Sequence, residues 1–290
     1  MKQTNQLTVM VLPKYDVRKE FIESLSTYVR HCLQQSKVMI VHDAEDGLES
    51  FLSHFQGQSS SSSPYSYTDA YQTFEEVGSK HPKKTKAKRE TFELQLETTM
   101  VMLCLAANKR LTLALSRQDI PALGLSGADL KSMTSSFLNM ERLGRIGGPP
   151  EIDFQAFEPL LDGGYVPVLS PICVDKKNRF LWVQPSSIAQ SLATSTTGAT
   201  LEVVWQEPIE QRPEQQKVTS KEIVQWMRQG TLPKRLIPLL QASLVAIGSG
   251  VNTVRVGSLE ELETDSAIQI VKQKQPAKHT LEEPQLNAYS

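Results

Sequence analysis

The sequence has few of the residues that mark disulfide-rich or metal-binding proteins. Its 290 residues include only three cysteines, Cys32, Cys104 and Cys173, and these lie far apart without any C-x-x-C spacing. This argues against a zinc site or a disulfide framework and favours a reducing compartment. The five histidines also lack the spacing of metal ligands, so no metal-binding residue is predicted.

Long apolar runs and excess charge are missing as well. The N-terminal apolar run ends at Pro13, which makes it too short for a signal peptide or a membrane span. The formal net charge is −1, so no general field attracts nucleic acid or a membrane surface. We therefore expect a soluble cytoplasmic protein that binds neither nucleic acid nor membrane.

Strands and helices are predicted to alternate from the start of the chain. Residues 7–12 and 37–42 are continuous apolar runs, which are typical of parallel strands covered on both faces. Between them, residues 18–35 place apolar side chains at helical spacing. A strand, a helix and a second strand with short connections predict a βαβ unit and a parallel sheet.

The same alternation continues to residue 271. Further helices are expected at 47–55, 90–107 (with 110–115 as an extension or as a separate helix), 154–161, 187–194, 220–229 and 235–247, and strands at 122–125, 166–170, 201–205, 253–256 and 267–271. Ser220 is expected to cap its helix. The serine-rich stretch 56–67 predicts a surface loop, the basic run 80–89 a solvated loop edge, and the polar segment 273–290 a disordered tail.

Three segments marked by glycine and proline carry a resemblance to a known family. They are GLSGAD at 124–129, GYVPVLSPI at 164–172 and GTLPK at 230–234. In this order they resemble the acetylglutamate kinases of the amino-acid kinase family, over roughly residues 7–271. The resemblance implies an α/β, amino-acid-kinase-like three-layer sandwich with a mainly parallel central sheet. It also implies a single domain over 1–272, with a substrate lobe at about 1–175 and a nucleotide lobe at about 176–272.

The resemblance further implies which residues would handle phosphate. Enzymes of this family position the phosphoryl group with lysines and backbone amides, and Lys14 and Lys234 match the two lysines. Lys234 and Gly230 would lie at the nucleotide. ATP and Mg²⁺ would be the cofactors of an active member.

Substrate and subunit contacts are implied in the same way. Gly124, Ser126 and Trp182 fall at positions implied for binding N-acetylglutamate or a related acyl amino acid. The apolar cluster at 100–105 is interpreted as core or, by analogy with the family, as part of a homodimer interface.

Several positions depart from the family pattern. Asp16-Val17 stands where the family has two glycines, and residues 43–46 (DAED) replace a second glycine run. Carboxylates repel phosphate, and a β-branched side chain blocks close approach of the backbone. Trp182 replaces an asparagine and Ser186 the aspartate that orients the lysines, while Trp205-Gln206 replaces a threonine-aspartate pair near the nucleotide.

These departures leave three hypotheses open. The first is an acetylglutamate-kinase-like protein with depleted catalytic motifs, a weakly active or inactive paralogue that binds or regulates. The second is an active acetylglutamate kinase of arginine biosynthesis, which transfers the γ-phosphoryl group of ATP to N-acetyl-L-glutamate. The third is a kinase for another carboxylate or a carbamate, because Trp182 would reshape the substrate pocket. The first is favoured because several anion-handling elements are missing together.

Overall fold

A computed structural model describes residues 6–13, 15, 18–43, 86–138, 145–209, 216–230 and 232–272. Its strands in the main sheet are β1 (Leu7–Leu12), β2 (Lys37–His42), β3 (Ala122–Leu125), β7 (Val166–Leu169), β10 (Thr200–Val204), β11 (Lys217–Thr219), β12 (Thr253–Gly257) and β13 (Ile268–Val271). They form one eight-stranded sheet in the order β11-β13-β12-β10-β1-β2-β7-β3. All neighbouring pairs are parallel except β12 and β13.

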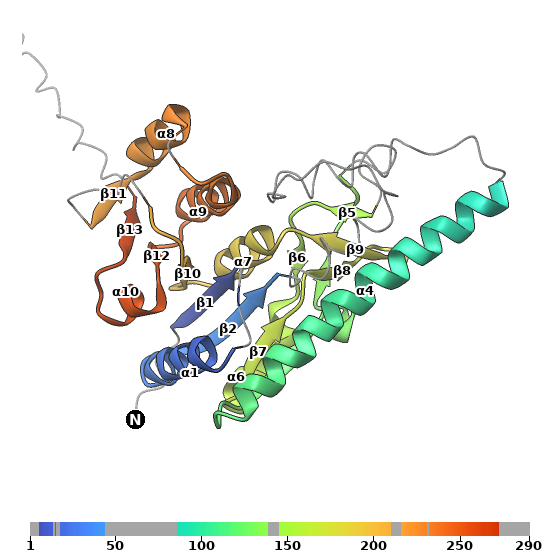
Figure 1. The fold of residues 1–290 in the computed structure, drawn as a ribbon, viewed down its shortest axis with the longest axis horizontal. Helices are drawn as coiled ribbons and strands as arrows, with labels where there is room; N and C mark the ends of the chain where they lie inside the picture. The colour runs from blue at the N-terminus through green and yellow to red at the C-terminus, as the bar shows by residue number, and fades with distance from the viewer. Residues whose placement is uncertain are drawn as a thin grey trace, which may run out of the picture.

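Helices cover both faces of this sheet (Figure 1). They are α1 (Lys19–Leu33), α4 (Lys86–Ser116), α6 (Glu158–Asp162), α7 (Pro185–Thr194), α8 (Ser220–Gln229), α9 (Ile237–Gly248) and α10 (Leu259–Glu263). None of these described helices is long and apolar enough to cross a membrane.

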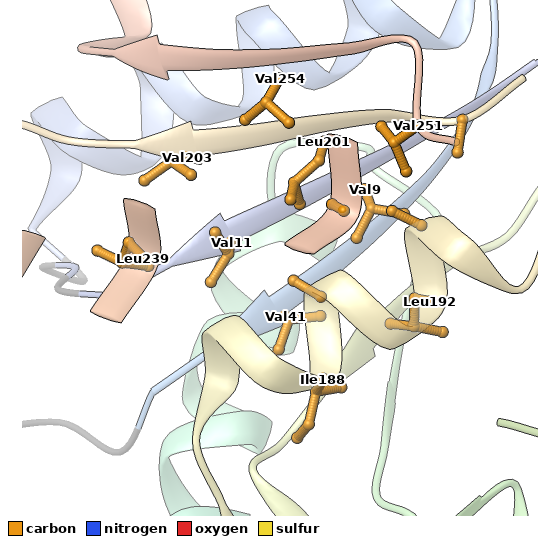
Figure 2. Packing of buried hydrophobic residues seen from close by; sticks show 14 of the residues in the cluster. Val9, Val11, Val41, Ile188, Leu192, Leu201, Val203, Leu239, Val251 and Val254 are labelled. Carbon is orange, nitrogen blue, oxygen red and sulfur yellow. The ribbon is translucent and has the colours of Figure 1, made fainter. Parts of the chain in front are cut away.

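The side chains of β1 show why the fold has three layers. Successive strand residues point to opposite faces, so Val9 and Val11 join the core under α7 and α9 (Figure 2). Met10 and Leu12 join a second core with residues of α1, α4 and α10. All four are buried, and each such side chain contributes about 1.5–3 kcal/mol to folding. The expected three-layer α/β sandwich with a mainly parallel sheet is therefore confirmed.

A smaller second sheet was not predicted. It contains β4 (Met133–Thr134), β5 (Ile146–Gly147), β6 (Glu151–Ile152), β8 (Ile172–Val174) and β9 (Phe180–Val183), in the order β5-β9-β8-β4-β6. Strands of two to four residues are too short for a pattern of alternating side chains to show in the sequence. In Figure 1 this sheet lies near the long helix α4.

Most of the predicted strands and helices are confirmed within a few residues. The prediction of a single helix over 154–161 was wrong, because a 3₁₀ turn at Phe154–Ala156 precedes α6. Thr219, and not Ser220, caps α8: its hydroxyl accepts from the amide of Glu222, whose carboxylate accepts in return. The short helix α10 and strand β11 were missed.

Other expectations concern segments that the structure describes in part or not at all. Residues 86–89, the end of the basic run expected to be a loop edge, begin α4. The predicted helix at 47–55, the serine-rich stretch 56–67 and the tail 273–290 lie outside the described residues.

Candidate functional site

The carboxyl edge of the central sheet is the expected position of a ligand site in this fold. Open parallel sheets bind ligands outside the carboxyl ends of their strands, where the strand order reverses. Here β1 has β2 on one side and β10 on the other, so the reversal falls at β1. The residues that follow β1, β2, β3, β7 and β10 therefore form the candidate site.

A buried polar cluster occupies this edge at the end of β2. Nδ1 of His42 lies 2.6 Å from the carbonyl oxygen of Asp43, and Nε2 lies 3.0 Å from Nδ2 of Asn108 on α4. A carbonyl oxygen can only accept, so the imidazole proton is on Nδ1 and Nε2 accepts from Asn108. The same amide group donates to the carbonyl oxygen of Val168 at 2.8 Å. The ring of Tyr15 stands edge-on to the imidazole.

The environment of His42 keeps its imidazole neutral. Burial lowers the pKa of His42 to about 4, although the hydrogen bond to the carbonyl of Asp43 acts in the opposite direction. Protonation of Nε2 would also set an N–H group against the N–H of Asn108. The end of β2 is therefore filled by an uncharged network of hydrogen bonds.

Gly124, predicted to contact substrate, lies in β3 against α4. A Cβ atom at this position would lie 2.3 Å from Oδ1 of Asn108 and 2.5 Å from Oγ1 of Thr112. Lys109 donates from Nζ to the carbonyl oxygen of Gly124 at 2.6 Å. The close approach of α4 to the sheet thus requires a glycine here. Substrate binding by Gly124 stays a prediction.

Four of the described backbone amides at this edge are already used within the chain. Phosphate cradles need amides that point away from other acceptors. The first amides after four of the parallel strands donate as follows: Asp43 to the carbonyl of Leu12 at 3.1 Å, Ser126 to Oδ2 of Asp129 at 2.6 Å, Ser170 to the carbonyl of Leu125 at 2.9 Å, and Trp205 to the carbonyl of Gly257 at 2.8 Å. An anion at these positions would have to displace an existing acceptor.

Ser126, the second predicted substrate residue, is held in a tight turn. Both its amide and its hydroxyl donate to Oδ2 of Asp129, at 2.6 and 2.8 Å. The next two residues, Leu130 and Lys131, have φ values of 56° and 52°, which L-amino acids adopt at an energetic cost. The turn is therefore fixed by its own hydrogen bonds, and the proposed contact of Ser126 with substrate stays a prediction.

Trp182 and Ser186 lie close together in sequence where the family resemblance implies polar side chains. Trp182 is 2% exposed in β9 and pairs across the small sheet with Ile172 and Ile146. Ser186 is buried in the first turn of α7, and its hydroxyl has no hydrogen-bond partner among the described residues. Neither side chain supplies a negative charge that could orient a lysine.

Of the two lysines predicted to handle phosphate, Lys14 and Lys234, the structure describes only Lys234. Lys234 begins the 3₁₀ turn Lys234–Leu236 before α9 and is exposed. Gly230 ends α8 with a φ of 70°, a left-handed conformation that favours glycine. Lys14 lies outside the described residues. The catalytic role of both lysines and the nucleotide contact of Gly230 stay predictions.

A pocket of about 340 Å³ opens at the carboxyl ends of β10 and β12. Its lining comes from the segment after β10, the end of β12, the start of α10 and β13: Trp205, Gln206, Glu207, Pro208, Ile209, Val256, Gly257, Ser258, Glu261 and Ile268. The sequence had pointed only to Trp205-Gln206. Ser258 and Glu261 form a capping box, and this serine-x-x-glutamate pattern after a predicted strand was the signal that could have found the rest.

Comparisons with known proteins identify the fold. No family model matches the chain. It is 27% identical over 193 residues to an acetylglutamate kinase of Bacillus pumilus, covering 64% of this chain and 75% of the relative. An acetylglutamate kinase of a Geobacillus strain is 25% identical over 172 residues, covering 59% and 67%.

Solved structures with the same fold superpose on this chain at lower sequence identity. A protein of Streptococcus mutans superposes with a TM-score of 0.64 at 13% identity, covering 91% of this chain and 98% of that one. Carbamate kinase of Giardia lamblia gives 0.55 at 10% identity, covering 94% and 100%. Aspartokinase III of E. coli gives 0.52 at 13% identity, covering 93% and 65%.

The chain has the amino-acid kinase fold. In sequence it is a distant relative of the acetylglutamate kinases. Within this amino-acid kinase fold, His42, Asn108 and the first amides after four strands are hydrogen-bonded at the sheet edge, and the pocket lies at the ends of β10 and β12.

Proposed function

We propose that this chain is an acetylglutamate-kinase-like protein that binds or regulates and transfers phosphoryl groups weakly or not at all. The observation that supports this most is the state of the sheet edge. The first amide after each of β2, β3, β7 and β10 is already bonded within the chain, and His42 and Asn108 fill the end of β2. Phosphoryl transfer depends on donors that are oriented before the substrate arrives.

Negative charge at the same edge also opposes the binding of a phosphoryl group. Asp43 is 5% exposed directly after β2, and burial, followed by the Asp43 carboxylate, raises the pKa of the Cys104 thiol. A carboxylate 4 Å from a phosphoryl oxygen would repel it by about 4 kcal/mol at an effective dielectric constant near 20. Ser186 cannot replace the orienting carboxylate that the family has at this position. The proposed protein would therefore hold an acyl amino acid or another small ligand without turning it over rapidly.

An active acetylglutamate kinase is the second candidate, because the curated relatives at 25–27% identity carry that name. In this case Lys14 and Lys234 would neutralise the phosphates, and ATP with Mg²⁺ would supply the phosphoryl group. The residues fit this group poorly in the described part of the sheet edge, so we derive no catalytic step through it. The cytoplasm and arginine biosynthesis are the proposed setting under either candidate.

A turnover assay separates the two candidates. The purified protein is incubated with ATP, Mg²⁺ and N-acetyl-L-glutamate, the acyl phosphate is trapped with hydroxylamine, and the Bacillus pumilus relative is assayed in parallel. We expect a rate far below the roughly 1–10³ per second that is ordinary for enzymes. A rate inside that range would establish the kinase. The same assay with a panel of other acyl amino acids and with carbamate tests a kinase of different specificity.

Nucleotide binding is tested separately by calorimetric titration with ATP and Mg²⁺. The Lys234→Ala variant is compared with Lys221→Ala, an exposed lysine on α8 that serves as the control. We expect no saturable binding that depends on Lys234. Binding that is lost only in Lys234→Ala would support the active kinase.

Self-association is part of the proposal. Leu94, Met102 and Leu113 of α4 are 62%, 65% and 53% exposed, and at 100° per residue they fall on one side of the helix. Large exposed apolar side chains on one face are typical of interfaces. We propose that α4 contributes to a homodimer. Light scattering after gel filtration should give twice the chain mass, and Met102→Glu should shift the protein toward the monomer.

A further inference from the structure

An ion pair joins the small sheet to α4 beyond the carboxyl edge of the central sheet. Nη2 of Arg145 lies 2.7 Å from Oε2 of Glu97 on α4, and both side chains are 17% exposed. On the same helix Asn108 is level with Gly124, near the end of β3, and the helix then continues to the start of this strand. Glu97 precedes Asn108 by about three turns, roughly 16 Å along the axis. The pair therefore lies past the strand ends, where α4 runs beside the small sheet (Figure 1).

Arg145 is held next to Trp182, one of the predicted substrate residues. Its carbonyl oxygen accepts from the amide of Trp182 at 2.9 Å, and the next residue, Ile146, pairs with Trp182 in the ladder of β5 and β9. Strand β9 leads into α7, and α7 leads to the start of β10, which is parallel to β1. A crossover helix between parallel strands runs back along the sheet, so α7 begins at the carboxyl edge. Arg145 therefore belongs to the part of the small sheet that adjoins the candidate site.

The guanidinium group of Arg145 is only partly hydrogen-bonded. It carries five N–H donors in a planar fork. Besides the contact with Glu97, Nη1 donates to the carbonyl oxygen of Phe180 at 3.5 Å, the outer limit of a hydrogen bond. Nε is buried and has no partner among the described residues. Open donors on a charged group away from water are unfavourable, and a carboxylate that bridges two neighbouring nitrogens is the acceptor that fits the fork.

We propose that Arg145 binds a carboxylate group of the ligand, and that Glu97 occupies the guanidinium until this carboxylate replaces it. The exchange gives the fork an acceptor with two free oxygens, which covers donors that the present contacts leave open. Glu97 is partly exposed, so its displaced carboxylate can turn to water. The proposal rests on the proposed function, because it names the residue that would hold the acyl amino acid.

The test is calorimetric titration of the purified protein with N-acetyl-L-glutamate in the absence of ATP. Its two monoamides, N-acetyl-L-glutamine and N-acetyl-L-isoglutamine, each replace one carboxylate with an uncharged group of the same shape. We expect one of them to bind about tenfold more weakly than the dicarboxylate, because a neutral amide makes weaker hydrogen bonds to arginine than a carboxylate does. That monoamide identifies the carboxylate that Arg145 holds.

Two variants of the ion pair should change the affinity in opposite directions. Arg145→Lys keeps the charge but loses the fork, and it should weaken N-acetyl-L-glutamate binding about tenfold while narrowing its advantage over that monoamide. Glu97→Gln removes the competing carboxylate and should strengthen binding about threefold, the scale of a partly exposed ion pair. Arg179→Lys is the control, since Arg179 forms a similar pair with Asp175 at 2.6 Å in the turn between β8 and β9, and it should leave the affinity unchanged.

An ion pair that only fastens α4 to the small sheet predicts the same sign for both variants. Weaker binding in Glu97→Gln, unchanged binding in Arg145→Lys, or no binding of N-acetyl-L-glutamate to the wild type at about 10 mM would therefore overturn the proposal. These results would leave the proposed function standing, because it concerns phosphoryl transfer. Rapid turnover in the hydroxylamine assay, with opposite shifts of affinity in the two variants, would refute only the proposed function.

Discussion

Acidification should destabilise this protein through one buried side chain, His42. The imidazole has no exposed surface and holds the end of β2 to α4 through Asn108. Its pKa in the folded protein is about 4, whereas that of an exposed histidine in the unfolded chain is about 6.5. Between these two values the unfolded chain binds one more proton than the folded chain, so folding stability must fall as the pH decreases.

The size of the effect follows from the difference in pKa. The contribution is fully present above about pH 6.5 and falls by roughly 1.4 kcal/mol for each pH unit below it. Relative to pH 8, the loss reaches about 2 kcal/mol at pH 5 and about 3 kcal/mol at pH 4. That loss is a large part of the roughly 5–15 kcal/mol that is the typical free energy of unfolding of a protein.

Urea unfolding at about pH 8 and about pH 5 measures this loss, with His42→Gln as the reference that keeps a donor and an acceptor but does not titrate. The wild type should lose about 2 kcal/mol more than the variant between the two conditions. Tyr15 and Asp43, which face the imidazole, are the same in both proteins. If both proteins lost stability equally, or if the His42 imidazole titrated near pH 6.5 in the folded protein by NMR, the reasoning would be refuted.

Two further predictions concern stability. Gly124→Ala should lower the free energy of unfolding by about 2–4 kcal/mol, since the new Cβ displaces a buried amide and breaks its hydrogen bonds; Gly248→Ala, which meets no atom within 4 Å, is the control and should cost nothing. Arg255→Leu should cost about 3–5 kcal/mol, because it leaves the buried Glu202 carboxylate without its positively charged partner at 2.9 Å, and among the described residues only the Tyr28 hydroxyl still donates to it. Chemical denaturation measures both changes. An unchanged free energy of unfolding in Gly124→Ala, or a loss well below about 3 kcal/mol in Arg255→Leu, would contradict these arguments.

The sequence by itself determined the alternation of the main sheet. The runs at 7–12 and 37–42 are continuous and apolar because strands covered on both faces must bury every side chain, and this local signal needs no knowledge of partners. Gly163-Gly164 after α6 and Pro238 in the first turn of α9 were readable for the same reason, since backbone conformation restricts residue type locally. The landmarks at 124–129, 164–172 and 230–234 carried the family resemblance that implied the amino-acid kinase fold.

Only the tertiary structure decided what the polar residues do. His42 was expected at a strand end, but its bond to Asn108 joins residues 66 positions apart, and no spacing rule relates them. The ion pair of Glu202 with Arg255 and the pocket lined by Trp205 also combine segments that are distant in sequence. Local patterns fix strands and helices because those depend on neighbours along the chain, whereas charges and hydrogen bonds acquire their partners, and their pKa values, only when packing brings distant segments together.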